Sequence, residues 1–177
     1  CTTHIPDEVF ARRDIAAHYA EAGIQVMPIN TMFQLVARQK ENPAWLDQAR
    51  HLLFMPDLFA YYLTGVPGNE YCIASTSELL DARGRTWNMP LIRDLGLPEH
   101  LFGPLLMPGN VRGMLLPEVA DELGLPRTVK VVAVGSHDTA SAVHAVPFRP
   151  GKETVSAFLS SGTWSLMGVE LEEADCR

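Results

Sequence analysis

The sequence predicts an α/β protein. Helical patterns fill the first half of the 177 residues, a region rich in proline and glycine covers residues 105–116, and a strand–helix–strand unit covers residues 129–159. Strands that alternate with helices in this way are typical of a sheet that packs against helices. The chain is long enough to bury a hydrophobic core.

The expected helices of the first hundred residues are bounded mostly by glycine and proline. Gly23 is placed to end the first, and Pro43 is placed to begin the third. The second is predicted to turn one apolar face toward the core, made of Met32, Phe33, Leu35 and Val36. These helices cover residues 6–22, 31–40, 43–49, 52–63 (interrupted at 56–57) and 87–95.

Residues 52–80 give mixed signals. Asp57 follows Pro56, so its carboxylate is expected to accept hydrogen bonds from the start of the helix there. The aromatic stripe Leu58, Tyr61 and Tyr62 has helical spacing and is predicted to pack in the core. Residues 71–80 are rich in serine and threonine and fit either a strand or a helix, so the pattern leaves both open.

The last third of the chain carries the densest set of signals. A compact helix is expected over residues 117–123, and the β-branched run 129–134 predicts a buried strand. Gly135 and Ser136 end this strand, and a short apolar helix follows to residue 146. A second strand over residues 154–159 leads into the turn 160–163, whose small residues are expected to offer free N–H groups to an anion. An ordinary hairpin is the alternative for this turn.

Asp138 stands where the strand gives way to the helix, at the sheet edge where α/β proteins bind ligands. Two interpretations stay open: an N-cap of the helix, or a base that takes a proton from a substrate hydroxyl. The two are compatible, because helix amide dipoles stabilise a negative charge there. His137 fits a structural hydrogen bond as well as a catalytic role. His144 lies about two turns further on, but we assign no metal site to this pair.

Composition limits the function classes. The net charge is −7, and the 14 lysine and arginine residues are scattered, which argues against a nucleic-acid surface. No apolar run reaches the roughly 18 residues that a membrane span needs, and no signal peptide is visible. The three cysteines show no metal-ligand spacing, and their low number favours a reducing compartment, the cytoplasm. We also expect this chain to be a piece of a longer protein.

Four ordered motifs resemble the FGGY carbohydrate kinases. They are Gly-Ile-Gln-Val-Met-Pro-Ile-Asn-Thr at 23–31, Leu-Phe-Met-Pro-Asp-Leu-Phe-Ala-Tyr-Tyr-Leu-Thr-Gly at 53–65, Gly-Ser-His-Asp-Thr-Ala-Ser-Ala-Val at 135–143 and Ser-Ser-Gly-Thr-Trp-Ser-Leu-Met-Gly at 160–168. The resemblance runs from about residue 6 to residue 170. It is strongest to the members that phosphorylate L-rhamnulose.

The resemblance implies a ribonuclease-H-like (actin-like ATPase) fold with two domains, with sugar bound in the first and ATP mainly on the second. Asp138 then matches the base that deprotonates O1 of L-rhamnulose, and His137 and Thr139 match residues that contact the sugar. Gly162 and Thr163 match the turn that contacts the phosphates of ATP, which Mg²⁺ would bridge. No residue of this chain is assigned as a metal ligand.

The resemblance also predicts how the chain is divided. Residues 1–150 would be the later part of the sugar-binding domain, and residues 151–177 the first hairpin of the ATP-binding domain. The family's opening phosphate loop and its adenine-binding motifs are missing, so we expect these residues alone to be inactive. The alternatives are a kinase of the family for another ketose or polyol, and a non-catalytic protein that binds sugar or nucleotide. The partners expected are sugar and ATP, with no nucleic acid or membrane, and the oligomeric state stays open.

Overall fold

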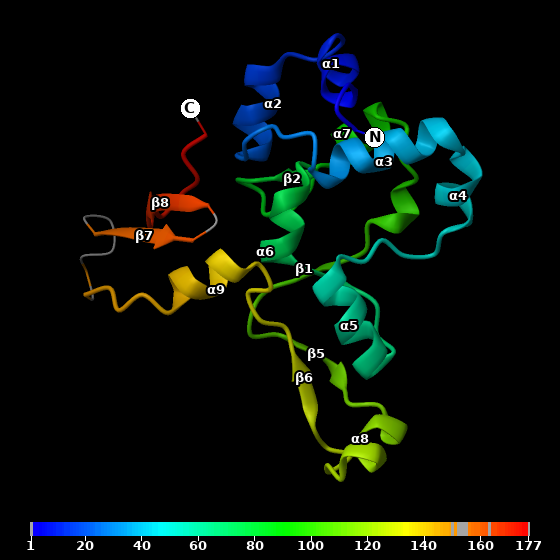
Figure 1. The fold of residues 1–177 in the computed structure, drawn as a ribbon, viewed down its shortest axis with the longest axis vertical. Coiled ribbons are helices and arrows are strands. Elements are labelled where there is room, and N and C mark those ends of the chain that lie inside the picture. Colours follow the sequence, from blue (N-terminus) through cyan, green and yellow to red (C-terminus); the bar gives the residue numbers. More distant parts are fainter. Residues whose placement is uncertain (1, 150, 152–155, 163, 177) are drawn as a thin grey trace.

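The computed structural model describes residues 2–149, 151, 156–162 and 164–176, and Figure 1 shows their arrangement. The helices are α1 (Ile5–Phe10), α2 (Ile15–Ala22), α3 (Thr31–Glu41), α4 (Pro43–Gln48), α5 (Met55–Thr64), α6 (Tyr71–Ala74), α7 (Met89–Asp94), α8 (Pro117–Leu123) and α9 (Asp138–His144), with 3₁₀ turns η1 (Ser75–Ser77) and η2 (Glu99–Leu101). The strands are β1 (Asn69–Glu70), β2 (Leu80–Asp81), β3 (Thr86–Trp87), β4 (Leu105–Leu106), β5 (Val111–Met114), β6 (Lys130–Val132), β7 (Ala157–Ser161) and β8 (Ser165–Val169).

The predicted α/β class is confirmed. The described strands form two-stranded pairs: β1 with β4 in parallel, and β2 with β3, β5 with β6 and β7 with β8 antiparallel. In Figure 1, α1–α4 and α7 gather at the top, β5, β6 and α8 extend at the bottom, and α9 leads to the β7–β8 hairpin at the left. The described residues contain no helix that is both long and apolar enough to cross a membrane.

The expected single helix over residues 6–22 is wrong, because the chain forms two helices there. The Asp14 side chain accepts a hydrogen bond from the Ala17 N–H at 2.7 Å and so begins α2 as an N-cap. Gly23 ends α2 as predicted: its φ is 65°, and its N–H donates to the Tyr19 carbonyl at 2.8 Å. The local polar cap therefore outweighed the helical periodicity across residues 11–14.

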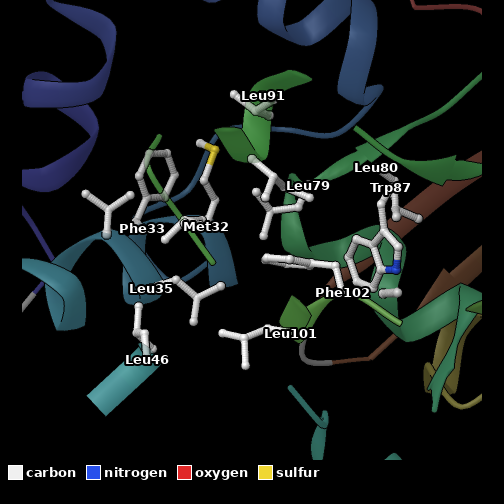
Figure 2. Close-up of a cluster of buried hydrophobic side chains, with 14 of the residues drawn as sticks. Met32, Phe33, Leu35, Leu46, Leu79, Leu80, Trp87, Leu91, Leu101 and Phe102 are labelled. Atoms are coloured by element: carbon white, nitrogen blue, oxygen red, sulfur yellow. The ribbon is translucent and has the colours of Figure 1, made fainter. Parts of the chain in front are cut away.

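The hydrophobic core lies between α3 and the elements from α6 to η2 (Figure 2). All four residues predicted for the inner face of α3 are buried, and Met32 and Phe33 are completely inaccessible. Trp87 packs edge-to-face on Phe102 at 5.1 Å between ring centroids, and its indole N–H donates to the Gly103 carbonyl at 2.7 Å. Each large apolar side chain buried in this way contributes about 1.5–3 kcal/mol to folding.

Several elements outside this core differ from expectation. The strand expected over residues 129–134 forms at Lys130–Val132, but Val132 and Val134 are 46% and 63% exposed, so it is not buried. Among the described residues β6 pairs only with β5, and a strand is buried only when layers cover both of its faces. The predicted core stripe on α5 is also wrong in part, because Tyr62 is 61% exposed.

Other elements resolve what the pattern left open. Residues 71–77 form α6 and η1, and only Leu80–Asp81 is extended. The helix α8 ends at Leu123, as predicted. Gly124 follows it in the left-handed conformation that commonly ends a helix. The strand expected at 154–159 appears as Ala157–Ser161, while residues 154 and 155 lie outside the described part of the chain.

Candidate functional site

The segment between β6 and α9 is held by hydrogen bonds to Glu70 and to Ser141 of α9. Ser136 donates two hydrogen bonds to Glu70 Oε2, from its N–H at 3.1 Å and from its hydroxyl at 2.6 Å. On the other side, the Ser141 hydroxyl donates to the Gly135 carbonyl, and the Ser141 N–H donates to the His137 carbonyl at 3.1 Å. The three residues His137, Asp138 and Thr139 lie between these anchors.

Asp138 presents a carboxylate to solvent. Its side chain is 96% exposed, and its Oδ1 accepts from the Thr139 N–H at 2.6 Å and lies 3.4 Å from Thr139 Oγ1. His137 Nε2 lies 3.7 Å from the same Oδ1. The structure therefore brings together the three residues that the resemblance assigned to the sugar.

The interpretation of Asp138 as an N-cap is wrong. His137 occupies the N-cap position with extended backbone (φ −81°, ψ 127°), and Asp138 is the first residue of α9. The carboxylate reaches only the adjacent N–H, whereas a capping side chain reaches the second or third one. This leaves Oδ2 without a hydrogen bond among those found in the described residues.

Glu70 is a functional candidate that our reasoning from the sequence missed. It is 1% exposed and accepts from the Cys72 N–H at 2.8 Å and the Ile73 N–H at 3.1 Å, as well as from Ser136. Burial pushes the pKa of Glu70 up, but the hydrogen bonds from Cys72 and Ser136 outweigh it, so this pKa lies below its ordinary value. The nearest sequence signal is an acidic residue directly before a helix, but nothing local identifies Ser136 as its partner.

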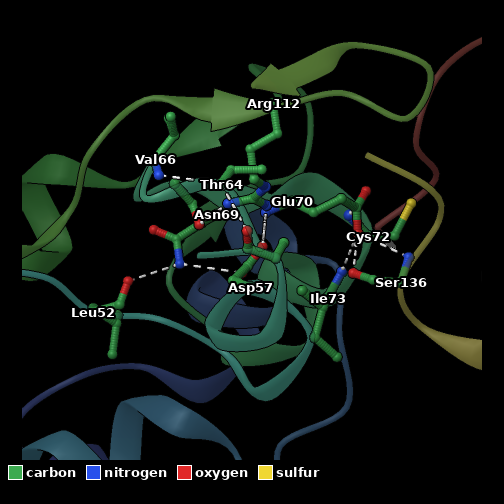
Figure 3. Close-up of polar contacts among 12 residues, drawn as sticks. Leu52, Asp57, Thr64, Val66, Asn69, Glu70, Cys72, Ile73, Arg112 and Ser136 are labelled. Atoms are coloured by element: carbon green, nitrogen blue, oxygen red, sulfur yellow. Dashed lines mark hydrogen bonds and ion pairs between the residues drawn. The ribbon is translucent and has the colours of Figure 1, made fainter. Parts of the chain in front are cut away.

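Asp57 contacts the backbone of Glu70, as Figure 3 shows. Its Oδ1 accepts from the Glu70 N–H at 3.0 Å and from Arg112, and its Oδ2 lies 3.4 Å from Asn69 Nδ2. The expected role of Asp57 at the start of α5 is therefore wrong, because the side chain turns inward to β1 and β5. Burial raises the pKa of Asp57, against the lowering effects of the Glu70 N–H and Arg112.

The hairpin β7–β8 contains the second predicted site. Ser160 pairs with Leu166 and Ser161 with Ser165, so the strands meet as an ordinary hairpin. The Gly162 N–H donates to the Trp164 carbonyl at 3.0 Å, which contradicts the expectation that this N–H is free. Thr163 lies outside the described residues. The helix α9 contacts β7, which brings the two predicted sites to neighbouring elements (Figure 1).

A surface cavity of about 590 Å³ lies elsewhere, between the β2–β3 turn and the segment after β8. Arg83 and Arg85 line one side of it, and Glu172 and Glu173 line the other. None of its lining residues belongs to the segment 135–141 or to the Gly162 turn. In the described residues no group of three or more histidine, cysteine, aspartate or glutamate side chains is placed to hold a metal ion.

Comparison with protein families shows the family to which this chain belongs. The model of the FGGY family of carbohydrate kinases, N-terminal domain, matches residues 2–144. The chain belongs to the FGGY family of carbohydrate kinases. The match includes Glu70, Ser136 and all three residues from His137 to Thr139.

Curated relatives in the FGGY family are similar over nearly the whole chain. The rhamnulokinase of Bacteroides thetaiotaomicron is 42% identical over 171 residues, which is 97% of this chain and 34% of the relative. The rhamnulokinase of Oceanobacillus iheyensis is 40% identical over 169 residues, which is 96% of this chain and 35% of the relative. The chain thus spans about a third of the length of the curated relatives that it matches.

Solved structures of FGGY kinases share the fold. A carbohydrate kinase from Novosphingobium aromaticivorans superposes with a TM-score of 0.76 at 26% identity, covering 92% of this chain and 34% of that one. The xylulose kinase from Rhodospirillum rubrum has a TM-score of 0.75 at 23% identity, covering 85% of this chain and 31% of that one. The described residues therefore form part of the actin-like ATPase fold that the resemblance implied.

Proposed function

We propose that the complete protein containing this chain transfers a phosphoryl group from ATP to O1 of L-rhamnulose. The observation that carries the proposal is the carboxylate of Asp138, which is 96% exposed at the start of α9 and flanked by His137 and Thr139. The names of the relatives at 40–42% identity support rhamnulose as the sugar. The cytoplasm, where sugar and ATP are both present, is the compartment that we propose.

Each residue of the site has a distinct role in the proposal. Asp138 accepts the proton of the O1 hydroxyl as the oxygen attacks the γ-phosphate, while His137 and Thr139 bind the sugar. General bases of this kind contribute roughly 10²–10⁴-fold to a rate. Because the transition state of phosphoryl transfer is loose, alignment of the reactants and neutralisation of charge supply most of the remaining rate acceleration.

The residues present fit the proposed nucleotide in part. Mg²⁺ prefers oxygen ligands and is commonly held by phosphates with one or two carboxylates, so it would enter with ATP and neutralise the charge of the phosphates. Asp138 is the exposed carboxylate at the site. The Gly162–Thr163 turn stays the proposed phosphate contact. A Cβ at Gly162 would have no neighbour nearer than 4.0 Å, so there is space beside this backbone, but the Gly162 N–H already donates to Trp164 and would have to be released to bind a phosphate.

Substitution of Asp138 tests the proposal. We expect Asp138→Asn in the complete protein to lower kcat at least 10²-fold, measured as ADP release with L-rhamnulose, because the amide cannot take the proton. Asp7→Asn is the matched control, since Asp7, like Asp138, is an exposed aspartate in the first turn of a short helix. An unchanged rate in Asp138→Asn removes this residue from the mechanism, whereas no sugar-dependent ADP release by the unsubstituted protein favours a non-catalytic binding protein.

A kinase for a different sugar is the second candidate. The solved structures that share the fold include kinases of xylulose and gluconate, so the fold by itself does not select the sugar. A panel of ketoses and polyols, compared by kcat/KM, separates the candidates: a preference for xylulose or fuculose over rhamnulose replaces the first proposal.

The 177 residues alone are proposed to be inactive, because they span about a third of their relatives. Sugar-dependent ADP release by the purified 177-residue chain contradicts this. Its oligomeric state, monomer or homodimer, is open to measurement by light scattering in the same preparation.

A further inference from the structure

We propose that Glu70 is a positioning residue that holds Asp138 in place through Ser136. The proposal rests on the proposed function only where it treats Asp138 as the base. The structural part, that Glu70 fixes the segment before α9, stands without it.

Glu70 joins two elements that are 66 residues apart in sequence. Its side chain caps α6 through the N–H groups of Cys72 and Ile73, which fixes the carboxylate on a helix that borders the core. The Cys72 N–H donates to Oε1, whereas the Ile73 N–H shares Oε2 with both donors of Ser136. One buried carboxylate therefore satisfies four donors, and two of them belong to the segment that precedes Asp138.

Apart from Glu70, the restraints found at the start of α9 among the described residues are local ones, in which Ser141 donates to the Gly135 and His137 carbonyls. None of the described residues of α9 is buried, so the helix has no apolar face that packs into the core. It contacts β7, which belongs to the β7–β8 hairpin and not to the hydrophobic core. Only one residue, His137, separates the clamped Ser136 from Asp138, so the position of Ser136 sets where the carboxylate of Asp138 can lie.

The contact between Glu70 and Ser136, called the clamp below, is part of a closed ring of contacts that includes β5 and β6. The Glu70 N–H donates to Asp57, Asp57 pairs with Arg112 on β5, and β5 pairs with β6, which runs back into Ser136. Every link of this ring except the one to Ser136 is made by buried groups or by strand pairing. A ring of this kind resists displacement of any single member, because each member has two fixed neighbours.

Glu70→Gln weakens the hydrogen bonds from Ser136 with little change of shape, because it removes the negative charge that accepts them. The amide keeps one acceptor but turns an NH₂ group toward N–H donors, so at least one bond to Cys72 or Ser136 is lost. Ser136→Ala removes the hydroxyl bond alone. Because these two residues act through one contact, the double variant is expected to be no worse than Glu70→Gln by itself.

Glu78→Gln is the matched control. Glu78 is also a buried glutamate, and it accepts from His18 at 3.0 Å, from the Met27 N–H at 3.2 Å and from Asn30. These contacts link α2 and α3 and include no residue of the segment 135–141. A loss of stability without an effect on the site should appear in this variant.

The test uses two readouts on the complete protein: steady-state kinetics, and amide hydrogen exchange of peptides covering residues 133–141. For Glu70→Gln we expect kcat to fall about 10–100-fold with the KM for ATP within about twofold, since a misplaced base slows chemistry more than binding. Exchange at 133–141 should rise about tenfold in Glu70→Gln and stay unchanged in Glu78→Gln. Should Glu70→Gln fail to fold, Ser136→Ala carries the test, with a smaller change expected in the same two readouts.

The outcomes separate this inference from the proposed function. If the unsubstituted protein turns over no sugar of the panel, the proposed function fails, and exchange at 133–141 alone decides whether Glu70 is the clamp. If the protein is active and Glu70→Gln, or Ser136→Ala in its place, changes neither kcat nor exchange beyond the Glu78→Gln control, the inference is overturned.

Discussion

Arg112 and Asp57 form an ion pair whose side chains are only 2% and 1% exposed. The guanidinium also donates to the Gly68 carbonyl at 2.8 Å, so it joins β5 to the chain just before β1. A buried pair of this kind is costly to break, because removal of one partner leaves the other charge without compensation. The first prediction concerns this pair.

Asp57→Ala should lower the free energy of unfolding by about 3–5 kcal/mol, because Arg112 would stay buried without its carboxylate. Urea denaturation followed by circular dichroism measures the change. The control is Asp121→Ala, which breaks the exposed Arg127–Asp121 pair and should leave the midpoint unchanged. Equal midpoints for the two variants would show that the buried pair stabilises the fold no more than the exposed pair does.

Gly23→Ala should destabilise the protein more than Gly124→Ala does. Both glycines follow a helix with φ near 65°, where an alanine costs about 1–2 kcal/mol. At Gly23 the added Cβ would also lie 2.9 Å from Ala82 Cβ, whereas at Gly124 it would meet nothing within 4 Å. Thermal unfolding of the two variants checks the order, and a larger loss in Gly124→Ala would contradict it.

The contribution of Glu70 to stability should depend on pH. Its pKa is lowered in the folded protein, so its stabilising effect is fully present above the ordinary value of 4.5 and is lost as the pH falls through the folded pKa. The difference in unfolding free energy between the unsubstituted protein and Glu70→Gln should therefore shrink below pH 4.5. The pKa of Asp57 is raised, so its own effect on stability has the opposite pH dependence. Asp57 is present in both proteins, however, and its effect therefore cancels from the difference between them. A difference that stays constant from pH 7 to pH 3 would exclude an ionised Glu70.

Cys72 should resist alkylation in the folded protein. Burial and the neighbouring Glu70 raise the pKa of this thiol from 9.0 to about 12. Because the thiolate is the reactive form, modification by iodoacetamide at pH 8 should be roughly 10³-fold slower than for an ordinary cysteine. Peptide mass spectrometry measures the rate, with the urea-unfolded protein as the control. Glu70→Gln should accelerate the reaction, since it removes the negative charge beside the sulfur.

Local features of the sequence were predicted well. The buried face of α3 and the glycines after α2 and α8 depend on spacing and capping within about four residues, and the structure confirms them. The motif around Asp138 was equally visible, because its glycine, serine and aspartate mark the change from strand to helix. Its role as the base stays a prediction.

The wrong predictions share a different property. The direction of Asp57 depends on Arg112, which lies 55 residues away, and the exposure of Val132 depends on which layers cover β6. Tyr62 has the spacing of a core residue, but no described element covers that side of α5 well enough to bury it. Periodicity shows that a face is apolar, and it does not show what packs on that face.

Sequence patterns were enough to identify the α/β class, the family motifs and the segment that carries Asp138. The folded chain was needed to show that Glu70 accepts hydrogen bonds from that segment and that Asp57 and Arg112 contact one another beside Glu70. The reason is physical: caps and helical faces act between near neighbours, whereas the partner of a buried carboxylate is set by the place to which the chain returns. Glu70 and Ser136 meet because the β5–β6 pair brings residue 136 back to the start of α6.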